Sequence, residues 1–380
     1  TSVTIPDSVT SIGEYSAFED CSSLTSVIIG DKVESIGRST FENCSNLESV
    51  AIPNSVISIG YEAFSGCSSL TTVNYAGTQV QWEEIEIDTF GNSKLTGATI
   101  NYNTITVTAS KVSDAISRLR KGSYTIIVTG EISDTTISDI NTALQSNSKA
   151  NVNLDLSKTT GELISIGDSA FYNCSNLTSV TIGDSVESIG YEAFYNCSSL
   201  TSVTIGNNVT SIGEKAFYSC NKLATVTIGN GITRIYKEAF YNCNKLTDLD
   251  LPDTVKTIKK YAFYGCTSLQ GIKLANGLNT IGNYAFSGCI NMNTIDMDVS
   301  SNLTAIGNHA FYDCENISSV VIGNGINYIG EYAFNSCENL NTLSLGCMLE
   351  NIGKCSLTSN SLKSITLTAK SLDEYCHSTA

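Results

Sequence analysis

The stretch 177-LTSVTIGDSVESIGYEAFYNCSS-199 decides the fold of this chain, because the same pattern begins again at Leu200. It reads L-x-x-V-x-I, then V-x-x-I-G, then A-F-x-x-C, and it recurs with a period of 23 residues. A fixed period of roughly 20–50 residues is typical of a solenoid. One unit has too little apolar area for a core of its own. Stacked units must therefore supply a continuous core, with Leu over Leu and Phe over Phe.

Each unit is expected to begin with a short strand. Polar and apolar side chains alternate from Ser179 to Ile182, which predicts one buried face and one wet face. The next residue turns the chain and is usually glycine. All three prolines of the chain stand in this turn slot, where proline suits the end of a strand: Pro6, Pro53 and Pro252. The A-F-x-x-C segment that closes each unit is spaced like one helical turn.

The 14 cysteines are not distributed like a disulfide set. Eleven of them follow the repeat Phe by three residues: Cys21, Cys44, Cys67, Cys174, Cys197, Cys220, Cys243, Cys266, Cys289, Cys314 and Cys337. One cysteine per coil at one register predicts a ladder of buried thiols. A zinc site is disfavoured, because no C-x-x-C pair and no neighbouring histidine accompany them. Cys347, Cys355 and Cys376 lie outside the register and are expected to be exposed.

The repeats fall into two arrays. We predict a first array at 1–103 with a divergent last coil, an insert at 104–160, a second array at 161–370 and a tail at 371–380. The chain opens one residue after a repeat Leu should stand, so we expect a fragment of a longer protein. Trp82, the only tryptophan, is expected to plug an open end of the first core, with a ligand-stacking role as the alternative.

The insert carries no 23-residue unit and predicts the order β-α-β-α-β. Its strands YTIIV (124–128) and VNLDL (152–156) are expected to pair edge to edge with the second array and to cap it. In that array the Phe spacing holds until two residues are inserted before Ile306. The last unit is degenerate, because Leu357 replaces Phe and Asn360 replaces Cys.

Charge and composition exclude several functions. The net charge of −16 argues against nucleic acid and against anionic membrane surfaces as partners. No apolar run approaches the roughly 20 residues of a membrane span, and no signal peptide is visible. The chain has two histidines: His309 stands in a variable slot and is expected to be exposed, and His377 stands in the tail. With no phosphate-binding or dinucleotide glycine motif and no local catalytic signature, we predict neither an enzyme nor a cofactor.

The wet face of the strands is the first candidate site. Its side chains are mostly Ser and Thr in the early coils of the second array and become charged in the middle. The predicted ligand-contacting residues there are Asp248, Asp250, Lys273, Asp296 and Asp298. A solvated face that only keeps the sheet soluble is the alternative. A calcium site among Asp248, Asp250 and Asp253 is a further one, although the spacing matches no loop motif and a lysine opposes it.

A tyrosine ladder is the second candidate site. One residue after the repeat Phe stand Tyr172, Tyr195, Tyr218, Tyr241, Tyr264 and Tyr312, whose rings are expected to stack from coil to coil. This strip is either packing along the outer flank or a binding surface, since aromatic residues are over-represented at interfaces. The first array carries Glu19, Glu42 and Ser65 in this slot, so the two arrays present different surfaces.

The unit L-x-x-V-x-I-(G/P)-x-x-V-x-x-I-G-x-x-A-F-x-x-C resembles the BspA-like branch of the leucine-rich-repeat proteins, over about 300 of the 380 residues. The stretch at 74–85, with N-Y-A-G-T and Trp82, is similar to the ending of such arrays. The resemblance implies an α/β solenoid: a curved right-handed coil with a parallel concave sheet and with short strands and helical turns on the convex side, here interrupted by the insert.

The resemblance also implies a cell-surface or secreted, adhesin-like protein that binds a protein or glycan on host or neighbouring cells. An inert spacer that displays other domains is the alternative, and a glycan- or calcium-binding module is another. The ligand, the oligomeric state and the angle between the arrays stay open.

Overall fold

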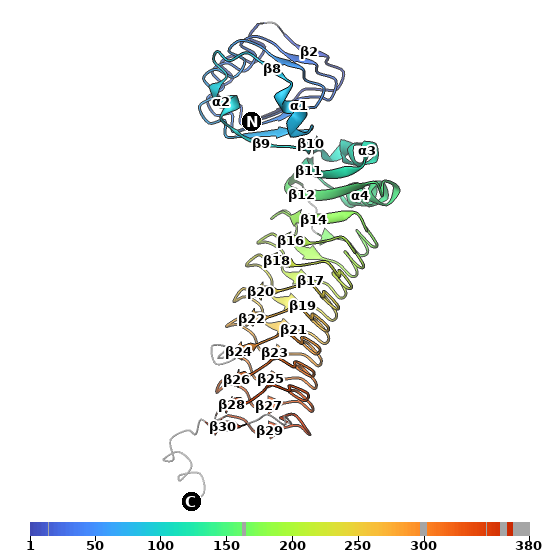
Figure 1. Cartoon of the computed structure of the whole chain (residues 1–380), viewed down its shortest axis with the longest axis vertical. Helices are drawn as coiled ribbons and strands as arrows, with labels where there is room; N and C mark the ends of the chain where they lie inside the picture. Colours follow the sequence, from blue (N-terminus) through green and yellow to red (C-terminus); the bar gives the residue numbers. More distant parts are fainter. Residues whose placement is uncertain (14, 162–164, 297–301, 347, 358–362, 368–380) are drawn as a thin grey trace, which may run out of the picture. The chain divides into compact units, whose positions relative to one another are not determined.

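The computed structural model describes the chain except for residues 14, 162–164, 297–301, 347, 358–362 and 368–380. The chain forms two compact units (Figure 1). The first comprises Thr1–Ala115 and Leu119–Thr129, and the second comprises Ile116–Arg118 and Gly130–Ala380. In both units a coil contributes a strand to each of two rows of parallel strands, so the predicted solenoid is confirmed.

The first unit has two parallel sheets whose strands follow in chain order, every second strand in the same sheet. One sheet comprises β1 (Ser2–Thr4), β3 (Ser26–Ile28), β5 (Ser49–Ile52), β7 (Thr72–Tyr75) and β9 (Thr99–Asn101). The other comprises β2 (Ser11–Ile12), β4 (Ser35–Ile36), β6 (Ser58–Ile59) and β8 (Glu86–Ile87). Val27 is opposite Val50, and Val50 is opposite Val73, so equivalent slots of successive repeats lie side by side.

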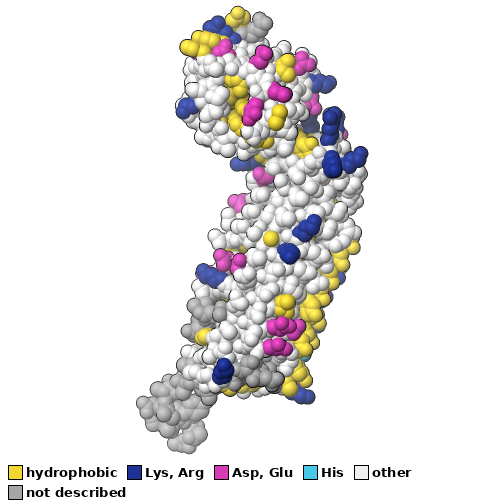
Figure 2. Space-filling model, in the orientation of Figure 1, with side chains coloured by type: hydrophobic (Ala, Val, Ile, Leu, Met, Phe, Trp, Pro, Cys, Tyr) yellow, Lys and Arg dark blue, Asp and Glu magenta, His cyan; other side chains and the backbone are white. Residues whose placement is uncertain are grey.

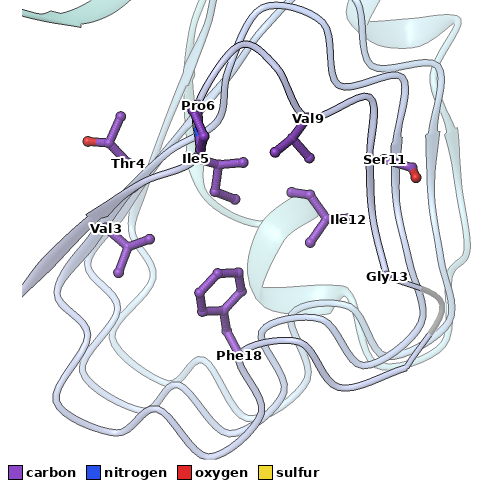
Figure 3. Close-up of a pocket in the computed structure, with 9 residues that line it drawn as sticks. All are labelled: Val3, Thr4, Ile5, Pro6, Val9, Ser11, Ile12, Gly13 and Phe18. Carbon is purple, nitrogen blue, oxygen red and sulfur yellow. The ribbon is translucent and has the colours of Figure 1, made fainter.

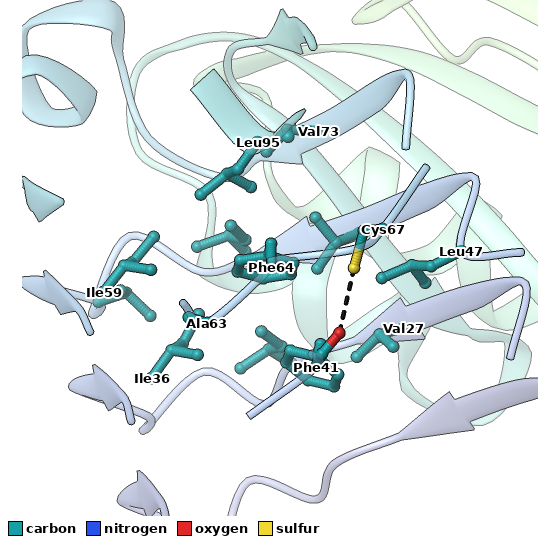
Figure 4. Close-up of a cluster of buried hydrophobic side chains, with 14 of the residues drawn as sticks. Val27, Ile36, Phe41, Leu47, Ile59, Ala63, Phe64, Cys67, Val73 and Leu95 are labelled. Carbon is teal, nitrogen blue, oxygen red and sulfur yellow. Dashed lines mark hydrogen bonds between the residues drawn. The ribbon is translucent and has the colours of Figure 1, made fainter. Parts of the chain in front are cut away.

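The first core lies between these sheets (Figure 4). The rings of Phe41 and Phe64 are fully buried and stacked with centroids 5.2 Å apart. The thiol of Cys67 donates a hydrogen bond of 3.1 Å to the carbonyl oxygen of Phe41, one coil earlier. Trp82, on α1 (Gln79–Glu83), packs half-buried against the same core and meets Tyr75 edge-on at 5.1 Å. Trp82 therefore has the position of a side chain that closes the core. The next helix along the chain is α2 (Ser93–Thr96).

The segment after the first array has the predicted β-α-β-α-β order. Its elements are β10 (Thr104–Thr108), the 3-10 turn η1 (Ala109–Lys111), α3 (Val112–Arg118), β11 (Gly122–Glu131), α4 (Asp134–Ser146) and β12 (Ala150–Thr160). In the first unit, β10 pairs with β11 in parallel. In the second unit, β12 pairs with β14 (Leu177–Ile182), as predicted for VNLDL, and places Leu154 opposite Val180.

The second unit also has two rows of parallel strands. The longer-stranded row runs from β12 through β14, β16 (Ser202–Ile205), β18 (Thr225–Ile228), β20 (Asp248–Asp250), β22 (Gly271–Lys273), β24 (Thr294–Asp296), β26 (Ser319–Val321) and β28 (Thr342–Leu345) to β30 (Ser364–Leu367). Its pairing is interrupted on both sides of the β20–β22 pair. We call the outward side of this row the strand face.

The other row of the second unit is one continuous nine-stranded sheet. It consists of two-residue strands: β13 (Ser165–Ile166), β15 (Ser188–Ile189), β17 (Ser211–Ile212), β19 (Arg234–Ile235), β21 (Thr257–Ile258), β23 (Thr280–Ile281), β25 (Ala305–Ile306), β27 (Tyr328–Ile329) and β29 (Asn351–Ile352). Ile281 pairs with Ile306, so the longer coil that precedes Ile306 keeps the register. Leu357, which replaces Phe in the last unit, is half-buried, and Asn360 lies outside the described residues.

The repeat Phe lies in a series of tight turns between the two rows. Two positions per coil have a left-handed backbone, as at Lys215 (φ 57°) and Ser219 (φ 56°). The N–H of Phe217 donates to the carbonyl of Ala239 in the next coil at 2.7 Å. The A-F-x-x-C spacing therefore builds turns that bond between coils, where the sequence suggested one helical turn.

The thiol ladder is present with one correction. Ten of the eleven register cysteines are buried free thiols, but Cys21 is exposed. Burial raises the pKa of the Cys266 thiol to about 12. Outside the register, Cys355 is half-buried, and Cys347 and Cys376 lie outside the described residues.

Candidate functional site

The strand face of the second unit positions the first set of predicted residues. Asp250 of β20 is opposite Lys273 of β22, and Asp248 is opposite Gly271. Asp248, Asp250 and Lys273 are all exposed. Asp296 stands in the same slot of β24, opposite Val321 of β26, and Asp298 lies outside the described residues.

Strand alternation explains why these charges point outward. Leu249 and Ile272 are buried at 2% and 9% exposure, and the residues on either side of each must point the opposite way. Within the part of the chain that the structure describes, neither Asp250 nor Lys273 forms an ion pair. Opposite charges on neighbouring strands are therefore both available to a partner.

The early coils of the same face are uncharged. Thr181 is opposite Thr204, and Thr204 is opposite Thr227, with the last two exposed. A row of threonines is a weakly interacting surface, whereas the β20–β22 pair is charged and lies where the sheet pairing is interrupted. The change of character predicted from the sequence is thus located at one pair of strands.

The corresponding face of the first unit is partly covered. Ala51 stands in the strand slot that Thr204 occupies in the second unit, but it is only 8% exposed. The segment that begins with β10 packs against β7, where Asn74 Nδ2 lies 3.5 Å from Thr106 Oγ1, and it continues to Lys111, which forms an ion pair with Asp7 in the first coil. This segment therefore contacts both β7 and the first coil, with the strand of Ala51 between them in the sheet order.

The tyrosine ladder is a continuous stack of five rings. The centroids of Tyr172, Tyr195, Tyr218, Tyr241 and Tyr264 follow one another at 5.0, 4.9, 4.6 and 4.8 Å. Tyr312 does not extend this stack, because Ser287 occupies the slot between it and Tyr264. Tyr312 instead meets His309 at 5.4 Å.

A second aromatic stack was missed at the sequence level. It occupies the slot two residues before the repeat Phe and comprises Tyr261, Tyr284, His309 and Tyr332, at 4.8, 4.4 and 4.9 Å. The signal was present, since four consecutive coils carry an aromatic ring in this slot. Edge-on contacts of Tyr261 with Tyr264 (5.6 Å) and Tyr241 (6.4 Å) join the two stacks.

His309 is therefore half-buried, where exposure was expected. The rings of Tyr284 and Tyr332 lie on its two faces. Its Nδ1 atom is buried and has no hydrogen-bond partner among the described residues. Burial lowers the pKa of His309, and the carboxylate of Glu331 acts in the opposite direction.

The stacking limits what the aromatic strip can do. Each inner ring uses both faces against its neighbours, so ring edges and hydroxyl groups are what a partner can reach. Burial, and then the neighbouring Tyr264 and Tyr218, raise the pKa of Tyr241 above its ordinary value. Figure 2 shows side chains of the hydrophobic class, in which tyrosine is included, following one flank of the second array.

An apolar pocket of 280 Å³ lies at the first coil (Figure 3). Val9, Ile12 and Phe18 point into it, whereas Thr4 and Ser11 point away. Ligand pockets usually combine apolar walls with a few convergent polar groups. This pocket is lined mainly by apolar repeat-slot residues of the first coil, so it is part of the core and has no convergent polar groups.

The described residues offer neither a metal cluster nor a membrane-spanning helix. No group of three or more His, Cys, Asp or Glu side chains there is arranged to hold a metal ion. Among the described helices, none has the length and apolar character needed to cross a membrane. His377 lies outside the described residues.

Comparison with known proteins identifies the repeat. The model of the BspA type leucine rich repeat region matches in six copies, over residues 1–114, 142–270 and 256–379. A search of curated proteins finds no match.

Several solved structures are similar to this chain. A leucine-rich-repeat protein of T. pallidum has 27% identity over 43% of this chain and 77% of its own, with a TM-score of 0.40. A leucine-rich-repeat protein of Bacteroides ovatus has 22% identity over 96% of this chain and 91% of its own, with a TM-score of 0.35. A leucine-rich cell-surface protein of Faecalibacterium prausnitzii has 24% identity over 99% of this chain and 86% of its own, with a TM-score of 0.35.

Proposed function

The chain belongs to the family of proteins with BspA-type leucine-rich repeats, and we propose that it is a non-enzymatic binding protein. Its partner is a macromolecule, protein or glycan, on a host or neighbouring cell. It acts from the cell surface or as a secreted protein, in the manner of an adhesin. Recognition depends on an extended surface of repeated coils and on no chemical step.

One observation carries this proposal: the strand face of the second unit is exposed and becomes charged at β20 and β22. Asp248, Asp250 and Lys273 lie on two paired strands of a rigid scaffold. The backbone of a parallel sheet is held by its hydrogen-bond ladder, so little backbone entropy is lost when a partner binds. The matching face of the first unit is partly covered by the segment that starts at β10, which favours the second unit as the binding surface.

A screen of the full chain against host matrix proteins, cell-surface proteins and glycans tests this proposal. The matched pair of variants is Asp250→Lys and Glu338→Lys. Both side chains are exposed and both changes alter the charge equally, but Glu338 lies in the turn after Cys337. Asp250→Lys is expected to weaken binding of the ligand found about tenfold, as for loss of a central charged contact.

Two results contradict the proposal. An inert spacer binds nothing in the screen, although both variants fold. A general electrostatic effect lowers the affinity equally in Asp250→Lys and Glu338→Lys. Labelling of intact producing cells with an antibody against the chain tests the location separately, and exclusive labelling after cell lysis contradicts a surface position.

A further inference from the structure

Positive charge is concentrated in one part of this acidic chain. Residues 215–273 hold nine of the 21 Lys and Arg residues and only four Asp and Glu, although the whole chain has a net charge of −16. The preceding segment, 161–214, holds six Asp and Glu and no Lys or Arg. A local excess of positive charge on an acidic protein creates a field that attracts anions to that place only.

The nine-stranded sheet brings four of these cations onto two consecutive coils. We call Arg234, Lys256, Lys259 and Lys260 the basic patch, and all four are exposed. Arg234 is opposite Thr257, so Lys256 and Lys259 lie one residue before and two residues after its partner. Adjacent parallel strands are about 4.8 Å apart, so Arg234 lies on the strand next to the stretch from Lys256 to Lys260.

The basic patch is not neutralised by neighbouring carboxylates. Lys237 next to it bonds to Glu214 at 2.9 Å and to Glu238 at 3.2 Å. In contrast, no ion pair involves any of the four patch residues in the described part of the chain. Lys260 Nζ instead lies 4.8 Å from the ring centre of Tyr261. Four unpaired like charges repel one another, so their grouping disfavours the free protein and favours an anionic partner.

We propose that the basic patch binds a short segment of an acidic polysaccharide, through the carboxylate or sulfate groups on its sugars. Lysine and arginine donate charge-assisted hydrogen bonds to such oxygens. Tyr236, two residues after Arg234, adds a half-exposed phenol that can bond to sugar hydroxyls. This surface differs from the strand face of Asp250 and Lys273, so the proposal does not depend on that face.

Other anionic partners fit the patch less well. Proteins that bind single-stranded nucleic acid stack bases on open aromatic faces. Here, within each of the two aromatic stacks, the inner rings have both faces covered by neighbouring rings. Protein interfaces have an apolar centre, but the patch is made of charged side chains, threonine and tyrosine. The acidic coils at 161–214 repel a long polyanion, which restricts the bound segment to a few sugars.

Binding of defined oligosaccharides to the full chain tests this proposal. The probes are a heparin oligosaccharide for sulfate, an alginate oligosaccharide for carboxylate and dextran as the neutral control. The patch variant Lys259→Gln/Lys260→Gln is compared with Lys222→Gln/Lys245→Gln, which removes the same two charges from exposed positions of nearby coils. Unchanged thermal unfolding by circular dichroism establishes that both variants fold.

At least one acidic oligosaccharide is expected to bind, and dextran is not. The patch variant should lose about fivefold in affinity, and the control variant less than about twofold. Equal losses in the two variants, or no binding of either acidic probe at low salt, overturn the proposal. So does equally tight binding of single-stranded DNA or polyglutamate of matched charge, which would assign the patch to a nucleic acid or to an acidic protein.

Discussion

His309 lies face to face with Tyr284, with ring centroids 4.4 Å apart and planes inclined by 9°. The two residues stand in the same slot of consecutive coils, although the longer coil separates them by 25 positions. The contact shows that register, and not sequence distance, decides which side chains meet in this fold. It also buries the only described histidine in an aromatic environment, with consequences for pH dependence.

Acidification should weaken the fold through His309. Its pKa is lowered in the folded state, so the unfolded chain binds the proton more readily, and stability falls as pH decreases through the ordinary range near 6.5. Thermal unfolding between pH 7.5 and 5.5 measures this. His309→Tyr, which preserves the stack, should lose less melting temperature over this range than the wild type. An equal loss in both proteins would assign the pH effect to carboxylates such as Glu331.

Truncation of a repeat Phe should be costly. Phe217 is fully buried and stacks on Phe194 and Phe240 at 5.1 and 5.2 Å. Phe217→Ala is expected to lower the free energy of unfolding by about 3–5 kcal/mol in urea titrations. Tyr218→Ala is the comparison. Because Tyr218 is only half-buried, this substitution should lower the free energy of unfolding by less. A cost below about 1 kcal/mol for Phe217→Ala would mean that this slot does not form the core.

The buried thiols should resist alkylation. Cys266 is fully buried with a pKa raised to about 12, so almost no thiolate forms at pH 8. Cys21 is exposed and should react first. A short iodoacetamide pulse followed by peptide mass spectrometry measures both sites, and Cys266 should react only after unfolding in urea. Comparable labelling of the two residues in the native protein would contradict the ladder.

Close approach between coils should make some glycines irreplaceable. A Cβ atom on Gly213 would lie 2.5 Å from the carbonyl oxygen of Gly190, whereas a Cβ on Gly271 would have no atom within 4 Å. Gly213→Ala should therefore cost about 1–3 kcal/mol of unfolding free energy, because backbone cannot move aside easily. Gly271→Ala should cost much less. Similar urea midpoints for the two variants would show that the coils can shift apart.

Much of the fold could be predicted from the repeat itself. The recurrence of Val, Ile, Phe and Cys at fixed spacing places Val180 beside Val203 and Phe217 over Phe240, because every coil has the same neighbours. The order of elements from β10 to β12 also followed from pattern, since helix and strand periods differ. The position of Asp250 beside Lys273 was predictable for the same reason.

Other features depended on contacts that the repeat does not encode. The segment from β10 to Lys111 contacts β7 and the first coil, and the repeat pattern contains nothing about that segment. The thiol of Cys67 donates to the Phe41 carbonyl only because the turn directs that oxygen toward the sulfur. Ser287 in the sequence already showed that Tyr312 is separated from the tyrosine stack. That Tyr312 contacts His309 instead became clear only from the geometry of the turn.

The amino-acid sequence by itself determined the coil, its core slots and the outward position of the charged strand residues, because a regular period leaves one way to stack identical units. Only the tertiary structure decided which outward surfaces remain open and which cations stay unpaired. Those properties depend on side chains that do not repeat from coil to coil. They meet through contacts between segments far apart in the chain, such as those of the segment from β10 to Lys111.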